Sequence, residues 1–481
     1  MRDDRNTGAA MLKKLILSVL CAAGCLSSAA GTEITVLQST DLHGSPAIAK
    51  FAKWIAEERK ADPDLLLIDC GDLTNGTFAT SCDGGASMVE CLNLCKYDVW
   101  VPGNHEFRIG NRNFRRAMEL FRSGDVLAAN LKFDDPRKKP ARPVLPWKLF
   151  ERKGVKIAVI GMASHRYDNW VGFALYNGIR LISPADTLRE IMPEVRRAKP
   201  DIIIVAAHSD VGQPVETVTG NDKWIPAKDV YAQYPDITLF LAGHTHRLVP
   251  LNEFAPGQWT VQPKDNGASM AKIRLEFDPA ARKVIKITAG IVESKNLQPL
   301  PDSEMPEAWR RNNQAALLAA KTPVAQIPAE MVWNAKTKQG GIPPELIPEI
   351  IRQAAGADAA ILGNILRLRP TSAGLTERFF QGIRNTGITV LTLTPEQLGT
   401  VLAEQGDIRG RSAGLDPAKL PEKNLRIAFD DYDVTGCDGK RMKLRAIALS
   451  GVPQEHLDLT VRSGVRDYFL GKYPAEKAPE K

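Results

Sequence analysis

The residues that could do chemistry lie in five short segments, each of which follows a run of branched apolar residues. These segments are Asp41-Leu42-His43, Gly71-Asp72, Gly103-Asn104-His105-Glu106, His208 and Gly243-His244-Thr245-His246. They hold five of the chain's seven histidines, a concentration that scattered surface or core histidines would not show. Carboxylate and amide oxygens combined with imidazole nitrogens suit Zn, Mn or Fe(II) better than Ca or Mg. The segments therefore predict a transition-metal site.

The number of candidate ligands indicates two metal ions rather than one. Seven ligands are too many for a single ion, but they suit two divalent ions about 3.5 to 4 Å apart that share a carboxylate. Such a pair activates water for in-line attack at phosphorus. We therefore predict phosphoester hydrolysis.

Strand and helix patterns explain how these segments could meet. Branched apolar runs at 34–37, 65–68, 157–160, 202–205 and 237–241 predict buried strands. Ile48, Phe51, Ala52 and Ile55 are spaced to form one apolar helix face, which favours an α/β sandwich. A predicted hairpin, 147–150 with 155–160, makes the sheets mixed. Ligands of open α/β sheets bind past the carboxyl ends of strands, where each segment lies.

The length of 481 residues indicates at least two domains. A proline-rich stretch, 298–306, follows a first domain predicted at 32–295, and residues 296–321 form a linker with a helix from about 307 to 321. A second domain at 322–473 mixes a helix pattern (345–355) with strands at 388–393 and 425–429. Residues 474–481 have the composition of a solvated tail.

The first 30 residues have the pattern of a secretory signal peptide. Lys13 and Lys14 precede an apolar run, 15–26, that is too short to span a bilayer, and Ser28-Ala29-Ala30 resembles a cleavage site. We expect a periplasmic or secreted protein, with a lipoprotein anchor at Cys25 as the less favoured alternative. No other apolar run reaches membrane-spanning length.

Charge and cysteine content limit the possible partners. Removing residues 1–30, which carry four basic and two acidic side chains, lowers the formal net charge from +7 to +5. That excess is too small to indicate binding of a nucleic-acid polymer. Five cysteines remain, so at least one thiol is unpaired, and a disulfide from Cys82 to Cys91 or Cys95 is the expected bridge.

The order and spacing of the five segments resemble the calcineurin-like metallophosphoesterases. The exported leader, the Gly-Asn-His-Glu-Phe sequence at 103–107 and the second domain are similar to the bacterial 5'-nucleotidase family, over most of residues 32–470. The resemblance implies a four-layer αββα sandwich followed by a smaller α+β domain. It also implies a small-molecule phosphoester substrate.

The resemblance carries specific roles over to individual residues. It places Asp41, His43 and His246 on one divalent ion, Asn104, His208 and His244 on the other, and Asp72 between them. It makes His105 the catalytic histidine, which would stabilise charge on the phosphoryl group or protonate the leaving oxygen. Two Zn, Mn or Fe ions are the implied cofactors.

Several positions depart from that family's pattern. Many members carry an aspartate where this chain has Arg108, which could either bind phosphate or face solvent. In the second domain, Arg367 is the one arginine that matches the substrate-binding loop. The two aromatic residues that clamp the nucleotide base are replaced by Asn385 and Lys440, unless Phe379, Phe380 or Tyr432 substitutes for them.

We therefore predict an exported dinuclear-metal phosphoesterase that is 5'-nucleotidase-like but has an altered base clamp. A thiosulfohydrolase-like or other non-nucleotide hydrolase on the same fold is the first alternative. A secreted metal-binding protein without catalysis is the second. The sequence does not indicate the oligomeric state.

Overall fold

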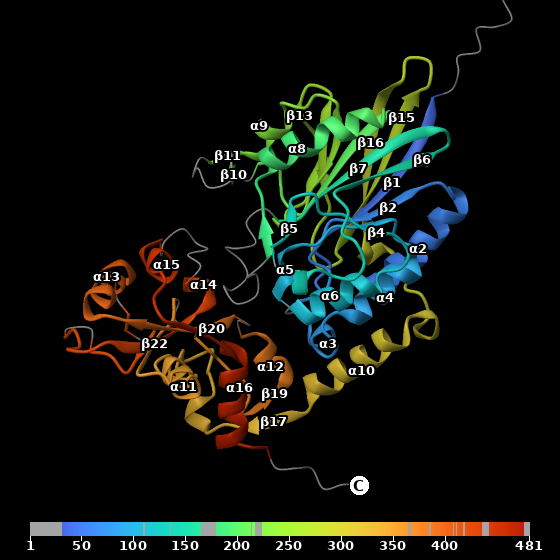
Figure 1. The fold of residues 1–481 in the computed structure, drawn as a ribbon. Coiled ribbons are helices and arrows are strands. Elements are labelled where there is room, and N and C mark those ends of the chain that lie inside the picture. Colours follow the sequence, from blue (N-terminus) through green and yellow to red (C-terminus); the bar gives the residue numbers. More distant parts are fainter. Residues whose placement is uncertain are drawn as a thin grey trace, which may run out of the picture.

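The computed structural model describes residues 31–475 apart from short internal stretches, and it shows two domains joined by one helix (Figure 1). The internal stretches outside the description are 109–110, 135, 165–178, 213, 217–223, 364–366, 384–385, 407, 410, 417–418 and 435–441. The predicted signal peptide and the last six residues also lie outside it. Within the described residues, no helix has both the length and the apolar character needed to cross a bilayer.

The first domain contains two six-stranded mixed sheets. The first sheet has the order β16-β15-β1-β2-β3-β4, with β1 to β4 parallel and the β15–β16 hairpin antiparallel at one edge. Its strands are β1 (Thr32–Ser39), β2 (Leu66–Asp69), β3 (Val99–Trp100), β4 (Asp125–Val126), β15 (Ser269–Asp278) and β16 (Lys283–Glu293).

The second sheet has the order β13-β14-β12-β9-β7-β6. Strands β14, β12, β9 and β7 are parallel, and β6 and β7 form the predicted hairpin, with Trp147 opposite Ile160. Its strands are β6 (Trp147–Arg152), β7 (Val155–Met162), β9 (Ile202–Ala207), β12 (Ile237–Leu241), β13 (Val249–Ala255) and β14 (Gln258–Gln262). All six residues of β9 are buried, as expected for a central parallel strand covered on both faces.

Helices cover the outer faces of both sheets, so the first domain has the predicted αββα layers (Figure 1). Side chains of α2 (Ile48–Ala61), α4 (Ala86–Cys95) and α6 (Asn111–Leu120) form a core on the first sheet. Those of α8 (Pro184–Arg197) and α9 (Ala227–Tyr231) form a core on the second sheet. A third core fills the space between the sheets. The predicted apolar face of α2 is buried.

Shorter elements occupy the connections of the first domain. They are α3 (Phe78–Ser81), α5 (Asn104–Arg108), the pair β5 (Leu131–Phe133) and β8 (Ile179–Leu181), and the pair β10 (Pro214–Glu216) and β11 (Trp224–Pro226). Single 3₁₀ turns lie at Pro136–Lys138, Ser294–Asn296, Asp302–Glu304 and, after the linker, Ala329–Met331. Of these, α5 matters most to function, because it begins in the Gly-Asn-His-Glu segment.

The predicted linker helix is α10 (Glu307–Lys321), which packs on α3 and α4 and then meets α12 (Glu377–Gln381) of the second domain (Figure 1). The second domain holds a pair, β17 (Pro323–Gln326) with β19 (Gly374–Thr376), and a five-stranded mixed sheet of order β21-β18-β22-β20-β23. The sheet strands are β18 (Ala359–Ile361), β20 (Gly387–Leu393), β21 (Ser412–Ala413), β22 (Leu425–Asp430) and β23 (Gln454–Thr460).

Helices cover both faces of the five-stranded sheet. Side chains of α11 (Leu346–Ala354) and α16 (Val461–Lys472) form a core on one face. Those of α13 (Pro395–Gln405) and α15 (Met442–Leu449) form a core on the other, and α14 (Asp431–Val434) directly follows β22. The predicted fold class, an αββα sandwich followed by a domain of mixed helices and strands, is therefore confirmed.

The expected disulfide is not formed. Cys82 is exposed, whereas Cys91 and Cys95 are buried on α4, and all three are free thiols in the structure. Cys91 and Cys95 are four residues apart, so they lie on the same face of α4 and fill the core under the first sheet. Their spacing reflects helix packing. Cys437 lies outside the described residues.

Candidate metal centre

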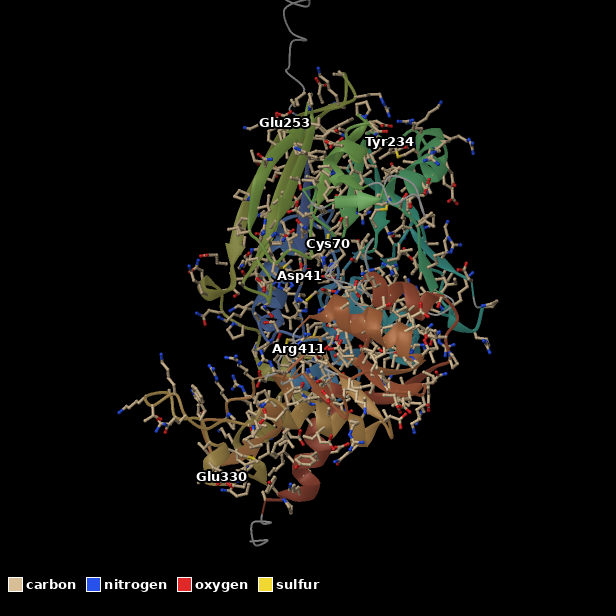
Figure 2. All side chains as sticks on the ribbon, turned by 90° about the vertical axis from the view of Figure 1, so that its left-hand side faces the viewer. Asp41, Cys70, Tyr234, Glu253, Glu330 and Arg411 are labelled. Atoms are coloured by element: carbon tan, nitrogen blue, oxygen red, sulfur yellow. The ribbon has the colours of Figure 1, made fainter. Side chains whose placement is uncertain are left out.

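The five predicted segments come together at the carboxyl ends of the parallel strands. Three of them follow β1, β2 and β3 of the first sheet, and two follow β9 and β12 of the second. Figure 2 shows Asp41 near the middle of the molecule, with Arg411 of the second domain below it. The sandwich therefore joins loops from two sheets at one place between the domains.

The ligand atoms form two groups that share one carboxylate. Asp41, His43, Asp72 and His246 each offer an atom within 4.8 Å of the others, and Asp72, His208 and His244 form a second such group. Asp72 is therefore placed to bridge two ions, as the resemblance implies.

Within each group, two imidazole nitrogens lie closer together than two lone pairs would without a cation or a proton between them. Nε2 of His43 lies 3.0 Å from Nε2 of His246, and the latter atom lies 3.2 Å from Oδ1 of Asp41. In the second group, Nε2 of His208 lies 3.0 Å from Oδ2 of Asp72 and 3.3 Å from Nδ1 of His244. Lone pairs converge at both places, so a cation between them would be strongly stabilised.

Asn104, the seventh predicted ligand, has a side-chain oxygen that is available to a metal ion. Asn104 is 2% exposed, and its Oδ1 has no hydrogen-bond partner among the described residues. A buried amide oxygen without a donor is costly, and coordination of a cation would remove that cost. Asn104 begins α5, whose next residue donates its backbone N–H to Oδ1 of Asp72 over 2.7 Å. The residues present therefore fit a pair of divalent ions.

Hydrogen bonds on the far side of the imidazoles hold the ligands in place. Nδ1 of His208 lies 2.7 Å from the carbonyl of Cys70, and Nδ1 of His43 lies 3.0 Å from that of Asn75. A carbonyl can only accept, so each Nδ1 carries the proton and each Nε2 presents its lone pair to the site. For His246, the carboxylate of Asp265 takes the place of the carbonyl: its Oδ2 lies 3.4 Å from Nδ1 of His246.

The backbone of the site is strained where it carries ligands. Five of the seven candidate ligands have a positive φ between 47° and 76°, namely Asp41, His43, Asp72, His244 and His246. This conformation is uncommon for residues other than glycine and gathers at functional sites. A Cβ added to Gly103 would lie 2.3 Å from Oδ1 of Asp72, so that glycine lets the two loops approach.

Glu106 is an organising residue of the site for which the sequence assigned no role. Its side chain is fully buried, and it accepts backbone N–H bonds from Asp72, Leu73, Thr74 and Gly103 at 2.6 to 3.0 Å. One carboxylate thus ties the loop after β2 to the loop after β3. Its place in the Gly-Asn-His-Glu sequence was the one signal that could have indicated a role for Glu106. Three of its four hydrogen-bond donors lie more than 30 positions away in the chain.

The electrostatics of the site favour charged carboxylates. Burial alone would raise the pKa of Asp72 and lower that of His208, but their attraction outweighs it. The pKa of Asp72 is held well below its usual range, and the pKa of His208 rises to about 10. Burial also opposes the charge on His43, whose pKa nevertheless rises to about 9 because of Asp41 and Asp72. Metal ions and protons therefore compete for these nitrogens.

His105 lies beside the ligands and is more accessible than most of them. Its side chain is 22% exposed, whereas those of Asp72 and His208 are 2% and 0% exposed. Its Nε2 lies 3.9 Å from Oδ2 of Asp72, and its ring meets that of His43 edge-on at 4.7 Å. A molecule that enters the site from solvent can therefore contact His105.

The structure does not bring all the predicted substrate residues to this site. Arg108 ends α5, but its side chain lies outside the described part. Arg367 lines a separate pocket of 430 Å³ with Trp333 and Arg369, and no metal-centre residue lines that pocket. The prediction that Arg367 binds substrate has no support from its position.

The base-clamp predictions are tested only in part. Asn385, Lys440 and the side chain of Tyr432 lie outside the described residues. Phe380 is fully buried in the core under α11 and α16, so it cannot stack on a base. Phe379 is half-buried and packs edge-on against Phe380 at 5.4 Å.

Comparison with known proteins agrees with this geometry. Residues 34–248 match the family model of the calcineurin-like phosphoesterases. Protein UshA of Yersinia enterocolitica is 26% identical over 284 residues, which cover 53% of this chain and 50% of that protein. A putative 5'-nucleotidase from Staphylococcus aureus has the same fold, with a TM-score of 0.71 at 16% identity over 93% of this chain and 98% of that one. The sulfate thiohydrolase SoxB of Thermus thermophilus also shares the fold, with a TM-score of 0.57 at 13% identity over 93% of this chain and 95% of that one.

The site and the family match define the class of the first domain: residues 34–248 match the calcineurin-like phosphoesterases, and the two ligand groups lie within that domain. The matching relatives and solved structures include 5'-nucleotidases and UshA proteins, in agreement with the resemblance noted from the motifs. The chain spans about half the length of the curated relatives that it matches.

Proposed function

We propose that this protein hydrolyses a small-molecule phosphoester at a dinuclear metal centre in the manner of a 5'-nucleotidase. The observation that carries the proposal is the shared carboxylate: Asp72 belongs to both ligand groups, and His105 lies beside it. A site built only for structural stability would be closed around a single ion, without an accessible histidine.

Each ligand has a proposed place. Asp41, His43 and His246 hold one ion, Asn104, His208 and His244 hold the other, and Asp72 bridges them. Oxygen and imidazole ligands suit Zn, Mn or Fe(II). When bound, two such ions supply a water nucleophile at neutral pH and neutralise charge on the phosphoryl oxygens.

The chain's own side chains do the rest. The Glu106 carboxylate fixes the backbone of the loops that carry Asp72 and Asn104, so the ligand geometry is set before substrate arrives. The His105 side chain is 22% exposed and its Nε2 lies 3.9 Å from Oδ2 of Asp72, where it can donate a proton to the leaving oxygen or a hydrogen bond to a phosphoryl oxygen.

The proposed substrate is a phosphomonoester whose leaving group is not held between two aromatic rings. One relative in the fold comparison is named a 5'-nucleotidase, which supports a nucleotide-like phosphoester. The residues at the clamp positions, Asn385 and Lys440, have no π-face, and Phe380 cannot replace them because it is buried.

We also propose that the protein works outside the cytoplasm, because its first 30 residues have the pattern of a signal peptide. Amino-terminal sequencing of protein recovered from the periplasm would test this. The expected first residue is Gly31, and a cytoplasmic protein that retains Met1 or Met11 would contradict the proposal.

The test of the function is hydrolysis of p-nitrophenyl phosphate by the full chain after reconstitution with Zn, Mn or Fe. We expect turnover that requires metal, with about two ions per chain by elemental analysis. Asp72→Asn should lower both metal content and turnover, because both ions share that ligand. Two bound ions without any phosphoester hydrolysis would favour the non-catalytic alternative, and hydrolysis of thiosulfate esters alone would favour the thiosulfohydrolase-like one.

A further inference from the structure

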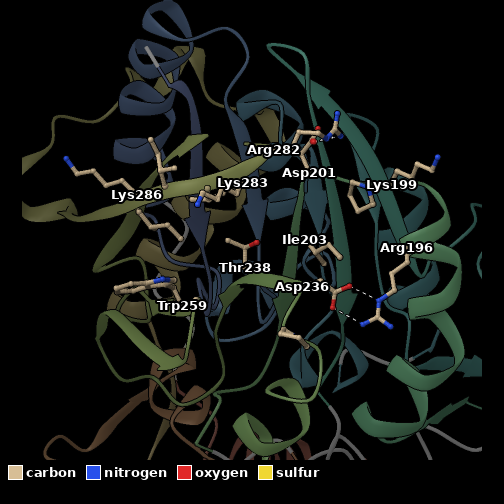
Figure 3. A pocket seen from close by; sticks show the side chains of 16 residues that line it. Arg196, Lys199, Asp201, Ile203, Asp236, Thr238, Trp259, Arg282, Lys283 and Lys286 are labelled. Carbon is tan, nitrogen blue, oxygen red and sulfur yellow. Dashed lines mark hydrogen bonds and ion pairs between the residues drawn. The ribbon is translucent and has the colours of Figure 1, made fainter. Parts of the chain in front are cut away.

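A second pocket lies at the end of the first domain that is opposite the metal centre. It has a volume of 460 Å³ and is lined by both sheets of the sandwich (Figure 3). Ile203 and Thr238 line it near the starts of β9 and β12, whereas His208 and His244 follow the ends of the same strands. Five residues of strand at about 3.3 Å each separate Ile203 from His208, so the two sites are roughly 17 Å apart.

Apolar side chains line part of this pocket although it is open to solvent. The indole of Trp259 is only half-buried, and Ile285 is 51% exposed. Phe277 pairs with Val284 and Glu276 pairs with Lys286, so Ile285 is an extra residue in β16. Such a bulge re-aims side chains and is common beside functional sites. Exposed aromatic and aliphatic groups in a concave site favour a ligand with an apolar part.

The charges around the pocket are unbalanced. Its lining residues include Arg196, Lys199, Arg282, Lys283 and Lys286, against two carboxylates, Asp201 and Asp236. Both carboxylates are already paired, Asp236 with Arg196 over 2.7 Å and Asp201 with Arg282. Within the described part of the chain, no acidic side chain pairs with any of the three lysines. The pocket therefore has a surplus of three positive charges.

The three lysines point in different directions. In Figure 3 Thr238 lies in the middle of the pocket and the side chains of Lys199 and Lys286 project away from it, and Lys283 also lines the pocket. Lys283, Thr238 and Trp259 thus offer an ammonium, a hydroxyl and an indole to the same pocket. An ammonium donates to anions and an indole offers a flat apolar face.

We propose that this pocket binds a small anion that carries an aromatic ring. The ring packs on Trp259 and Ile285, and the anionic group accepts hydrogen bonds from Lys283 and Thr238. One molecule of this class fits the volume of the pocket, its apolar lining and its positive charge. A purely inorganic anion would leave Trp259 exposed. The site is independent of phosphoester hydrolysis, because no metal-centre residue lines it.

The test uses 2-naphthoate as the probe, since it has a ring and a carboxylate but no phosphoester. Isothermal titration of the metal-loaded full chain should give a dissociation constant on the order of 0.1 to 1 mM. Lys283→Gln and Trp259→Ala should each weaken binding by about tenfold or more. Acetate, which has the charge without the ring, should bind far more weakly.

Lys286→Gln is the matched control, because it removes the same charge from a neighbouring side chain that projects outward. It should change the dissociation constant less than about threefold. Lys283 is exposed, so unchanged thermal unfolding of Lys283→Gln will show that the fold is intact. Equal losses in the two lysine variants, or no binding of 2-naphthoate below 10 mM, would overturn the proposal.

Discussion

His105 and Glu106 are adjacent in sequence but act on the site in different ways. His105 faces the accessible side of the ligand cluster, whereas Glu106 is buried behind it and contacts only the protein. A substitution of the first should therefore act on catalysis and a substitution of the second on the framework. The contrast provides two separate tests.

His105→Asn should keep both metal ions and lower turnover of an aryl phosphate by roughly 10² to 10⁴-fold, the usual share of a positioned acid or electrostatic partner. The ligand groups themselves do not include His105, so metal content should not change. Elemental analysis and steady-state kinetics on the same preparation measure both quantities. His456→Asn, in the second domain, is the matched control and should leave turnover intact. Near-normal turnover of the His105 variant would remove that residue from the mechanism.

Glu106→Gln should destabilise the protein and loosen metal binding. The amide keeps one acceptor but turns an NH₂ group toward backbone N–H donors, and each hydrogen bond to a charged acceptor is worth about 1.5 to 3 kcal/mol. We expect a loss of roughly 2 to 4 kcal/mol in the free energy of unfolding, measured by urea denaturation. Glu119→Gln is the control, because Glu119 also accepts a backbone N–H, from Ala141, but is exposed. Similar losses in both variants would show that the network around Glu106 has no special role.

At the scale of the elements, a buried titratable group, the carboxyl of Asp431, lies at the end of an interior strand of the five-stranded sheet in the second domain. Asp431 follows β22 and is 3% exposed, and its carboxylate accepts from the hydroxyl of Thr389 on β20. The same hydroxyl lies 2.8 Å from Nδ1 of His456 on β23. Burial, with a smaller contribution from Asp430, raises the pKa of Asp431 to about 7.

That raised pKa predicts how the second domain responds to pH. Between about pH 4 and pH 7 the folded protein holds a proton that the unfolded chain has released, so stability should fall as pH rises through this window. Asp431→Asn should remove this component, which amounts to roughly 2 to 4 kcal/mol across the window. Urea denaturation of both proteins at pH 4.5 and pH 8 measures it. The exposed Asp458→Asn variant should behave like the wild type, and a pH dependence unchanged in Asp431→Asn would contradict the assignment.

At the scale of the whole molecule, we expect the second domain to select the substrate by completing the site of the first. The resemblance predicts that Asn385 and Lys440 replace the two base-stacking aromatics. Loss of two stacking contacts of about 1 to 3 kcal/mol each should weaken nucleoside binding by roughly 30-fold to several thousandfold. The kcat/KM for adenosine monophosphate should therefore not exceed that for a simple aryl or sugar phosphate.

A double variant tests the same point in the opposite direction. Asn385→Phe with Lys440→Tyr should raise kcat/KM for adenosine monophosphate relative to the aryl phosphate, through a lower KM. The aryl phosphate is the internal control, since it has no base. A wild-type preference for adenosine monophosphate of tenfold or more would contradict the altered clamp, and Phe379 would then be the first residue to examine.

The chemistry of the first domain could be predicted from sequence because its signals are local. Each ligand segment directly follows a strand, and parallel strands place their carboxyl ends at one edge of a sheet. Asp41, Asp72 and His208 could therefore be brought together without coordinates. The strands and the α10 helix could be predicted for the same reason, because the periodicity of apolar residues repeats within a few residues.

Other features were decided only by the tertiary structure, because they depend on segments that are distant in the chain. The hydrogen bonds of Glu106 require the loop after β2 to lie against α5, which no local pattern encodes. A disulfide from Cys82 to Cys91 or Cys95 was expected, yet Cys91 and Cys95 are buried in the core under the first sheet and Cys82 is exposed, and all three are free thiols in the structure. The pocket beside Trp259 is lined by β16 of one sheet, which has a bulge at Ile285, and by β12 and β14 of the other. Contacts of this kind form when separately folded elements pack, so their geometry is a property of the whole fold.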